Sequence, residues 1–167
     1  RRETPGDPPS QWDVEHAEYM AFGVVHAEDL PSGRALRAVR GSESPDDGML
    51  VGITSPPLPV ADSDTILAVD YKVKVIRGSH FGYIVGGNIY VNWRVDPDKN
   101  FIAAGQTIGQ LHDGWNRIRV IADRERNEMY VYLNAMDENA RNGPFPLRSR
   151  PSTWKGQNLR LAHVVNQ

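Results

Sequence analysis

Apolar and polar side chains alternate over residues 113–135, and this period of two predicts a β-hairpin. A turn over 124–127 pairs Asp123 with Glu128 and gathers the apolar residues on one face, namely Ile118, Val120, Ala122, Met129, Val131 and Leu133. The opposite face then carries Arg117, Arg119, Ile121, Tyr130, Tyr132 and Asn134. A slip of one residue would mix the two sets, so the pattern also predicts the register.

Two more stretches alternate in the same way. Residues 65–77 predict a half-buried antiparallel strand whose core side holds Leu67, Val69, Tyr71, Val73 and Val75. Residues 80–95 predict a second hairpin that turns at 86–88. Pairing Val85 with Ile89 assigns to the core side Phe81, Tyr83, Val91, Trp93 and Val95. The same pairing assigns to the opposite side His80, Ile84, Tyr90, Asn92 and Arg94.

The remaining segments complete an all-β pattern. Shorter strands are expected at 12–26, 35–40, 49–53, 101–108 and 158–165. Between them lie long polar loops at 41–64, 96–114 and 135–157. Residues 1–10 are rich in proline and read as a flexible N-terminal segment or linker. About ten short strands without a long helix predict one antiparallel β-sandwich domain over residues 11–167.

Composition and charge narrow the function classes. A chain of 167 residues suits one domain, and the absence of cysteine excludes disulfides and thiolate metal sites. Residues 1–64 hold twelve acidic and five basic side chains, whereas 141–167 hold five basic and none acidic. This asymmetry has two interpretations, neighbouring strands of opposite charge or a basic patch for an anionic polymer. No nucleic-acid-binding motif accompanies the net charge of −2, and no apolar run is long enough to span a membrane.

The 113–135 hairpin resembles the laminin-G and concanavalin-type jelly-roll family. Its opening Trp115, its charged turn and its closing run 132–135 (Tyr-Leu-Asn-Ala) carry this resemblance, together with 33–37 (Gly-Arg-Ala-Leu-Arg). The resemblance covers about a third of the chain and implies a concanavalin-like jelly roll. The family includes lectins, carbohydrate-binding modules, glycoside hydrolases, polysaccharide lyases and adhesion modules, and the fold alone does not choose among them.

The two hairpins together predict a glycan-binding face. We expect an extended and preferably anionic glycan to contact Tyr90, Asn92, Arg94, Arg117, Arg119, Tyr130 and Tyr132 on one sheet face. Tyrosine rings stack on sugars, and arginine recognises carboxylate or sulfate in a bidentate manner. The same side chains would equally suit a solvated sheet or one covered by loops 96–114 and 135–157. This interpretation predicts a non-catalytic, extracellular carbohydrate-binding or adhesion module, which we expect to belong to a larger protein that has lost a preceding segment.

An enzyme remains the alternative, because His80, Tyr90, Asn92 and Arg94 supply the residue types that a polysaccharide lyase uses for β-elimination. The triplet Gln110-Leu111-His112 resembles one motif of alginate-lyase jelly rolls, although the companion motifs are missing. The carboxylate pattern of retaining glycosidases on this fold, Glu-x-Asp-x-x-Glu, is also missing. A structural subunit whose sheet face binds a protein partner is the third class.

One loop is a candidate calcium site. Asp96, Asp98 and Asn100 offer oxygen ligands at alternate positions, as a hard cation requires. The glycine that an EF-hand-like loop would place next is Phe101. A type I turn with Pro97 at its second position explains the same residues, so both interpretations stay open.

Overall fold

The computed structural model describes residues 11–15, 20–28, 30–32, 34–40 and 52–166. The predicted N-terminal segment 1–10 therefore lies outside the described residues, as do residues 41–51 of the predicted loop 41–64. Within them every regular element is a β-strand except one short 3-10 helix, η2 (Glu138–Ala140). The prediction of an all-β chain is confirmed.

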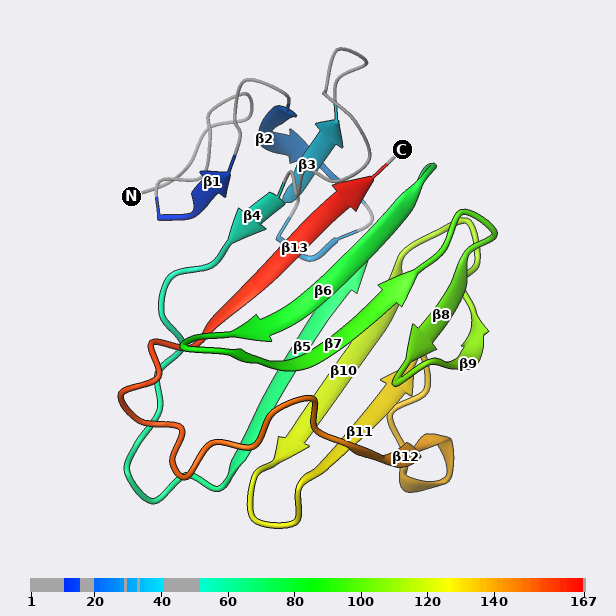
Figure 1. Cartoon of the computed structure of the whole chain (residues 1–167). Helices are drawn as coiled ribbons and strands as arrows, with labels where there is room; N and C mark the ends of the chain where they lie inside the picture. Colours follow the sequence, from blue (N-terminus) through cyan, green and yellow to red (C-terminus); the bar gives the residue numbers. More distant parts are fainter. Residues whose placement is uncertain (1–10, 16–19, 29, 33, 41–51, 167) are drawn as a thin grey trace.

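In the described part of the chain, thirteen strands form three antiparallel sheets (Figure 1). The seven-stranded sheet has the order β1-β4-β13-β6-β7-β8-β9. Its strands are β1 (Asp13–Glu15), β4 (Gly52–Thr54), β13 (Arg160–Asn166), β6 (Ser79–Val85), β7 (Ile89–Val95), β8 (Asn100–Ala103) and β9 (Gln106–Gln110). The four-stranded sheet has the order β12-β11-β10-β5, with β12 (Asn142–Pro146), β11 (Glu128–Leu133), β10 (Asn116–Asp123) and β5 (Ile66–Val73).

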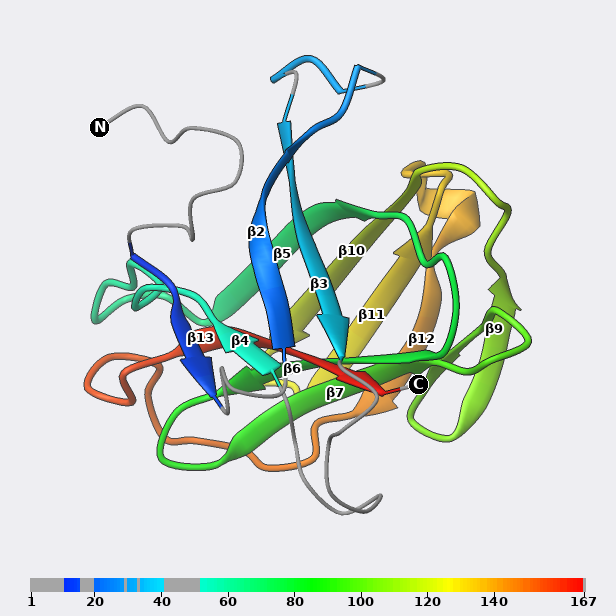
Figure 2. The same cartoon turned by 90° about the horizontal axis from the view of Figure 1, so that it is seen from above.

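The third sheet is the hairpin of β2 (Met20–His26) and β3 (Arg34–Arg40). The two larger sheets lie one behind the other as two layers in Figure 1, and the view from above shows the hairpin crossing one end of them (Figure 2). Sequence reasoning anticipated both strands of the hairpin, although not that they would form a separate unit.

The core lies between the two larger sheets. Val69 of β5, Val120 of β10 and Val131 of β11 are buried against Val91 and Trp93 of β7. Ile118 is buried as well, whereas Tyr71, Val73 and Leu133 are partly buried and pack at the margin of the core. The antiparallel sandwich and most of its expected core are confirmed.

The register of the hairpin β10–β11 is the predicted one. Asp123 pairs with Glu128, Val120 with Val131, and Arg119 with Tyr132. The pairing of β10 with β5 continues this pattern, because Val120 also lies opposite Val69. Alternation of apolar and polar residues therefore determined both the strands and their faces here.

The hairpin β6–β7 departs from the prediction on one of its strands. Val85 pairs with Ile89 as expected, but Ile84 then pairs with Val91, so that Tyr90 is an extra residue in a β-bulge. The bulge reverses the faces of β6 relative to the prediction: Ile84 and His80 point into the core, whereas Phe81 and Tyr83 lie on the outer face. The assignment of β7 is correct for Val91, Trp93 and Val95.

Candidate functional site

The predicted glycan-binding residues do not share one sheet face. Asn92 and Arg94 lie on the outer side of β7 in the seven-stranded sheet, while Arg117 and Arg119 lie on the outer side of β10 in the four-stranded sheet. Because the two sheets pack through their apolar faces, these outer sides look in opposite directions. The prediction of a single face is wrong, since it treated two sequential hairpins as neighbours within one sheet.

The outer side of the four-stranded sheet satisfies its own charges. Both guanidinium groups bind the carboxylate of Asp70: Arg117 donates from Nε and Nη2 at 2.9 and 2.6 Å, and Arg119 donates from the same atoms at 3.0 and 2.7 Å. The hydrogen bond from Arg117 is the main reason why the pKa of Asp70 lies below its usual value. One carboxylate thus engages the Nε and Nη2 donors of both guanidinium groups, which leaves fewer donors for a ligand.

The tyrosines of this side are occupied as well. The Tyr130 hydroxyl donates to Glu128 Oε2 at 2.6 Å, and the guanidinium of Arg141 lies over the Tyr130 ring, 4.8 Å from its centroid. Tyr132 is only 3% exposed, so its ring offers no free face for a sugar. The expectation that Tyr132 provides an exposed stacking platform does not fit this burial.

Tyr90 is also part of the core rather than of an outer face. It is 3% exposed, its hydroxyl donates to Gln157 Oε1 at 2.5 Å, and its ring meets that of Trp154 edge-on at 5.6 Å. Trp154 is fully buried and donates from its indole nitrogen to Thr65 O. Tyr90 therefore anchors the segment after β12 to the sandwich, a role that the predicted alternation without a bulge hid.

The four residues of the lyase hypothesis do not converge. His80 lies on the core side of β6, where its Nε2 lies 2.7 Å from Nδ1 of His163 on β13 and the two rings stack. Burial lowers the pKa of His80 to about 4. Asn92 and Arg94 point to the opposite side of the same sheet, so no single substrate position faces all four side chains. Of the triplet 110–112, Leu111 is buried in the core, and His112 Nδ1 accepts from Gly114 N.

The outer side of the seven-stranded sheet has a different character. Phe81 and Tyr83 follow each other on β6, with ring centroids 6.5 Å apart and ring planes nearly parallel at 8°. Across the hairpin, Phe81 pairs with Arg94 and Tyr83 pairs with Asn92. Residues paired in this way have Cβ atoms about 5 Å apart. Two partly exposed aromatic rings are therefore lined by a guanidinium and an amide.

A hollow of about 230 Å³ lies beside this row of side chains. Its lining comes from β7, the β8–β9 turn, β11 and the end of β12, and consists of Val91, Asn92, Ala104, Met129, Pro146, Leu147 and Arg148. The main-chain N–H of Arg148 donates to Tyr90 O at 2.9 Å, which holds this segment against β7. Asn92 and Arg148 are the two polar side chains of the lining. In the described part of the chain, neither Arg94 nor Arg148 forms an ion pair with a carboxylate, although the pKa of Asp96, lowered mainly by hydrogen bonds from Asn100, is lowered further by the charge of Arg94.

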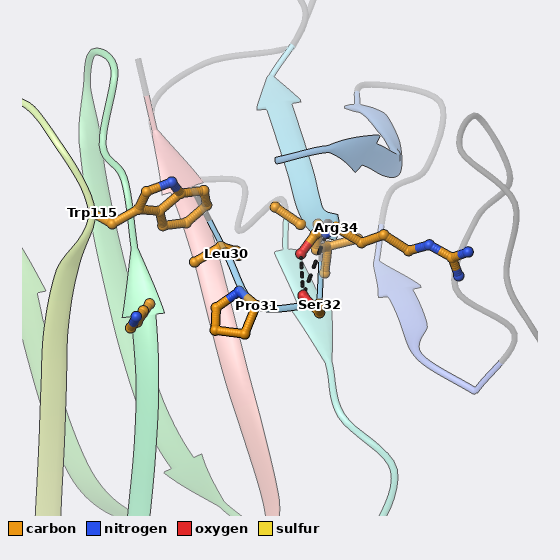
Figure 3. A pocket seen from close by; sticks show the side chains of 8 residues that line it. Leu30, Pro31, Ser32, Arg34 and Trp115 are labelled. Atoms are coloured by element: carbon orange, nitrogen blue, oxygen red, sulfur yellow. Dashed lines mark hydrogen bonds between the residues drawn. The ribbon is translucent and has the colours of Figure 1, made fainter. Parts of the chain in front are cut away.

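A larger cleft of about 500 Å³ lies between the β2–β3 hairpin and the four-stranded sheet (Figure 3). It is lined by Leu30, Pro31, Ser32, Arg34, Ala35, Leu36, Lys72 and Trp115. Ser32 Oγ donates to Arg34 O and accepts from Arg34 N, while the Arg34 side chain points away from Trp115 (Figure 3). The walls are mostly apolar and contain few groups that could orient a polar ligand.

The candidate calcium loop, residues 96–100, forms a turn, which is the second of the two interpretations of its sequence. Lys99 N donates to Asp96 O at 2.9 Å, and both carboxylate oxygens of Asp96 accept hydrogen bonds from Asn100, at 2.9 and 3.0 Å. Lys99 forms an ion pair with Asp113, and Asp98 O accepts from Gln110. Among the described residues, no three His, Cys, Asp or Glu side chains are grouped so that they could hold a metal ion. The donor set fits a turn better than an ion, and calcium stays a prediction that a melting curve in excess chelator would decide.

The charge asymmetry is partly explained by ion pairs between the two ends of the chain. Arg160 pairs with Asp13, and Lys155 pairs with Asp62. These pairs support the interpretation that segments of opposite charge lie side by side. No helix in the described residues is long and apolar enough to cross a membrane.

Comparison with known proteins shows the fold. No protein-family model matches the chain, and no curated protein matches it in sequence. A solved sialidase structure matches with a TM-score of 0.66 and 12% identity over 94% of this chain, which corresponds to 13% of the sialidase chain. A carbohydrate esterase from the Shiga toxin-encoding bacteriophage phi24B matches with a TM-score of 0.57 and 11% identity, over 92% of this chain and 81% of the esterase. At these identities the likeness shows that the chain has a β-sheet fold that also occurs in these two proteins.

Proposed function

We propose that this domain is a non-catalytic carbohydrate-binding module and that the outer side of the seven-stranded sheet binds an extended glycan. Phe81, Tyr83, Asn92 and Arg94 form the central contact surface. The observation that carries the proposal is the contrast between the two outer sides: Arg117 and Arg119 are hydrogen-bonded to Asp70, whereas Arg94 forms no hydrogen bond or ion pair with a carboxylate among the described residues.

The side-chain chemistry of this surface suits a sugar. Aromatic rings pack against the C–H faces of pyranose rings, while amide and guanidinium groups donate hydrogen bonds to hydroxyls. Strand residues two apart lie about 6.8 Å from each other, so the surface presents its groups in regular rows along an extended ligand. The sialidase and the carbohydrate esterase that share the fold are by name carbohydrate-processing proteins, which supports a carbohydrate-related role for this chain.

A binding role accounts for the geometry better than the lyase alternative. A lyase needs a base in contact with the substrate, and His80 instead lies beneath the sheet with its imidazole held against His163. The same proposal includes an extracellular location, because polysaccharides and glycoconjugates are concentrated at cell surfaces. It also includes membership of a larger protein.

A matched pair of substitutions tests the assigned face. Tyr83→Ala should weaken binding to a glycan that the wild-type protein binds on an array, roughly fivefold or more. Loss of one stacking ring costs on the order of 1 kcal/mol. Tyr130→Ala removes a partly exposed tyrosine from the opposite side and should leave the affinity unchanged. Circular dichroism of both variants checks that each is folded.

Three results would contradict the proposal. The first is an affinity that depends on Tyr130 and not on Tyr83. The second is the absence of binding to any glycan on the array. The third is the appearance of unsaturated uronate in an ultraviolet assay with uronic-acid polymers, which would establish the lyase instead.

A further inference from the structure

Arg148 is the cation that sequence reasoning missed. It lies in the irregular segment after β12, where no alternation indicates its direction, yet its backbone is held against β7 by the hydrogen bond from its N–H to Tyr90 O. This bond places residue 148 beside the hairpin whose outer side carries Asn92. Four segments that are distant in sequence thereby meet around one hollow.

The surroundings of Arg148 favour an anion. Apart from Arg148 and Asn92, all the residues that line the hollow are apolar. Arg148 is exposed, so its guanidinium is accessible to a ligand that enters the hollow. Arg148 is also close enough to Tyr83 to act on its ionisation. Burial raises the pKa of Tyr83, and the positive charge of Arg148 opposes this rise.

Several other arginines among the described residues are occupied. Arg117 and Arg119 bind Asp70, Arg160 binds Asp13, and Arg150 donates to the main-chain oxygens of Arg124 and Glu125. Arg148 has no comparable partner among the described residues. The guanidinium of Arg148 and the amide of Asn92 together offer N–H groups that can donate hydrogen bonds to the oxygens of a carboxylate or a sulfate.

We infer that the hollow lined by Asn92 and Arg148 binds the acidic group of an anionic glycan, a carboxylate or a sulfate ester, and that Arg148 determines this specificity. The inference rests on the proposed glycan-binding function and adds the class of sugar. Neutral parts of the glycan lie along Phe81 and Tyr83, and the acidic group enters the hollow at the end of this row. Arg94 on the neighbouring row contributes to the attraction without lining the hollow.

The test compares acidic glycans with neutral partners of the same backbone. Each carboxylated oligosaccharide on an array is printed beside its methyl ester, and each sulfated one beside its desulfated form. The wild-type protein should prefer the acidic member of at least one pair roughly tenfold or more, as expected for a charge-assisted bidentate contact. Which pair shows the preference distinguishes carboxylate from sulfate.

Arg148→Ala should abolish this preference while binding of the neutral member persists, and Arg148→Lys should restore part of it, because lysine keeps the charge without the planar donor pair. Arg77→Ala is the control: it removes one exposed positive charge outside the lining of the hollow and should keep the preference.

Failures of the two proposals are distinguishable. A glycan that binds with the same preference in wild type and in Arg148→Ala overturns the inference and leaves the glycan-binding function intact. An equal loss of preference in Arg77→Ala also overturns the inference, because it indicates a general charge effect. Absence of binding to every glycan, neutral or acidic, overturns the proposed function itself.

Discussion

Gly82 and Trp93 face each other across β6 and β7, and their contact explains why β6 has its observed faces. A Cβ atom on Gly82 would lie 2.2 Å from Cε2 of the Trp93 indole, far inside van der Waals contact. The indole N–H of Trp93 donates a hydrogen bond to the Tyr71 hydroxyl at 2.6 Å. The large ring on β7 therefore fits into the core only because the opposite position on β6 has no side chain.

Substitution of Gly82 by alanine should lower the free energy of unfolding by about 1–3 kcal/mol, the typical cost of overpacking a close-packed core. Urea denaturation measures this change. In a Trp93→Leu background the same alanine should cost clearly less, because the clashing ring atoms are gone. An equal cost in both backgrounds would show that the contact does not determine the effect.

The same pair shows what the sequence could have revealed about β6. A lone glycine inside an alternating strand, with a tryptophan at the matching position of the partner strand, indicates close approach on one face. This signal places Gly82 and Trp93 together and with them Ile84 and His80 on the core side. The hydrophobic pattern alone instead favoured Phe81 and Tyr83 as core residues, because both are large and aromatic.

At the scale of elements, prediction was most successful where both strands of a hairpin alternate without interruption. The register of β10–β11 followed from six apolar positions that could face only one way. The bulge at Tyr90 could not be inferred in this manner, since one extra residue changes the pairing without changing the composition. The prediction of one glycan-binding face was wrong for a related reason. Alternation assigns a residue to one side of its strand, but it does not show to which of the two sheets the strand belongs.

The strands β6 and β13 carry two stacked histidines, the buried His80 and the partly buried His163. Their ring centroids are 4.9 Å apart, Tyr71 meets His163 edge-on at 5.1 Å, and His80 Nδ1 has no hydrogen-bond partner among the described residues. Burial lowers the pKa of His80 to about 4 and that of His163 well below its usual value, with the charge of His80 adding to the effect on His163. Both rings are therefore neutral in the folded protein at pH 7.

This pair should make stability depend on pH. The unfolded chain binds protons at histidine near pH 6.5, whereas the folded chain does not until about pH 4. Lowering the pH through this window favours the unfolded state, by up to about 1.4 kcal/mol per pH unit for each histidine. Urea denaturation between pH 7.5 and 5 measures the slope.

His163→Gln should reduce this slope by up to one proton, because one of the two titrating rings with a lowered pKa is removed. His26→Gln, at an exposed position of β2, is the control and should leave the slope nearly unchanged. A slope that is the same in wild type and in His163→Gln would contradict the assignment.

At the scale of the whole molecule, the sandwich depends on the layer between its two sheets. Val120 has no exposed surface and lies in the middle of β10, opposite Val69 on one side and Val131 on the other. Ile121 is the next residue of the same strand and points to the outer side, where it is partly exposed. The two positions differ in the sheet face that they occupy and not in their strand.

Val120→Asp should prevent folding, because it places an unpaired charge in a closed apolar layer. Ile121→Asp introduces the same charge one residue away and should leave a folded domain of somewhat lower stability. Circular dichroism and gel filtration distinguish a folded from an unfolded chain. A folded Val120→Asp variant would show that the layer is not closed at this point.

Asp70 has a consequence for the history of such a surface. This single carboxylate, about one-third exposed, holds two arginines that are themselves partly exposed, and exposed ion pairs of this kind contribute at most about 1 kcal/mol to stability. Its replacement by a neutral residue would leave the fold intact and release two guanidinium groups next to each other. The outer side of the four-stranded sheet is thus one substitution away from presenting two unpaired guanidinium groups, so affinity for an anion can be introduced there at little cost in stability.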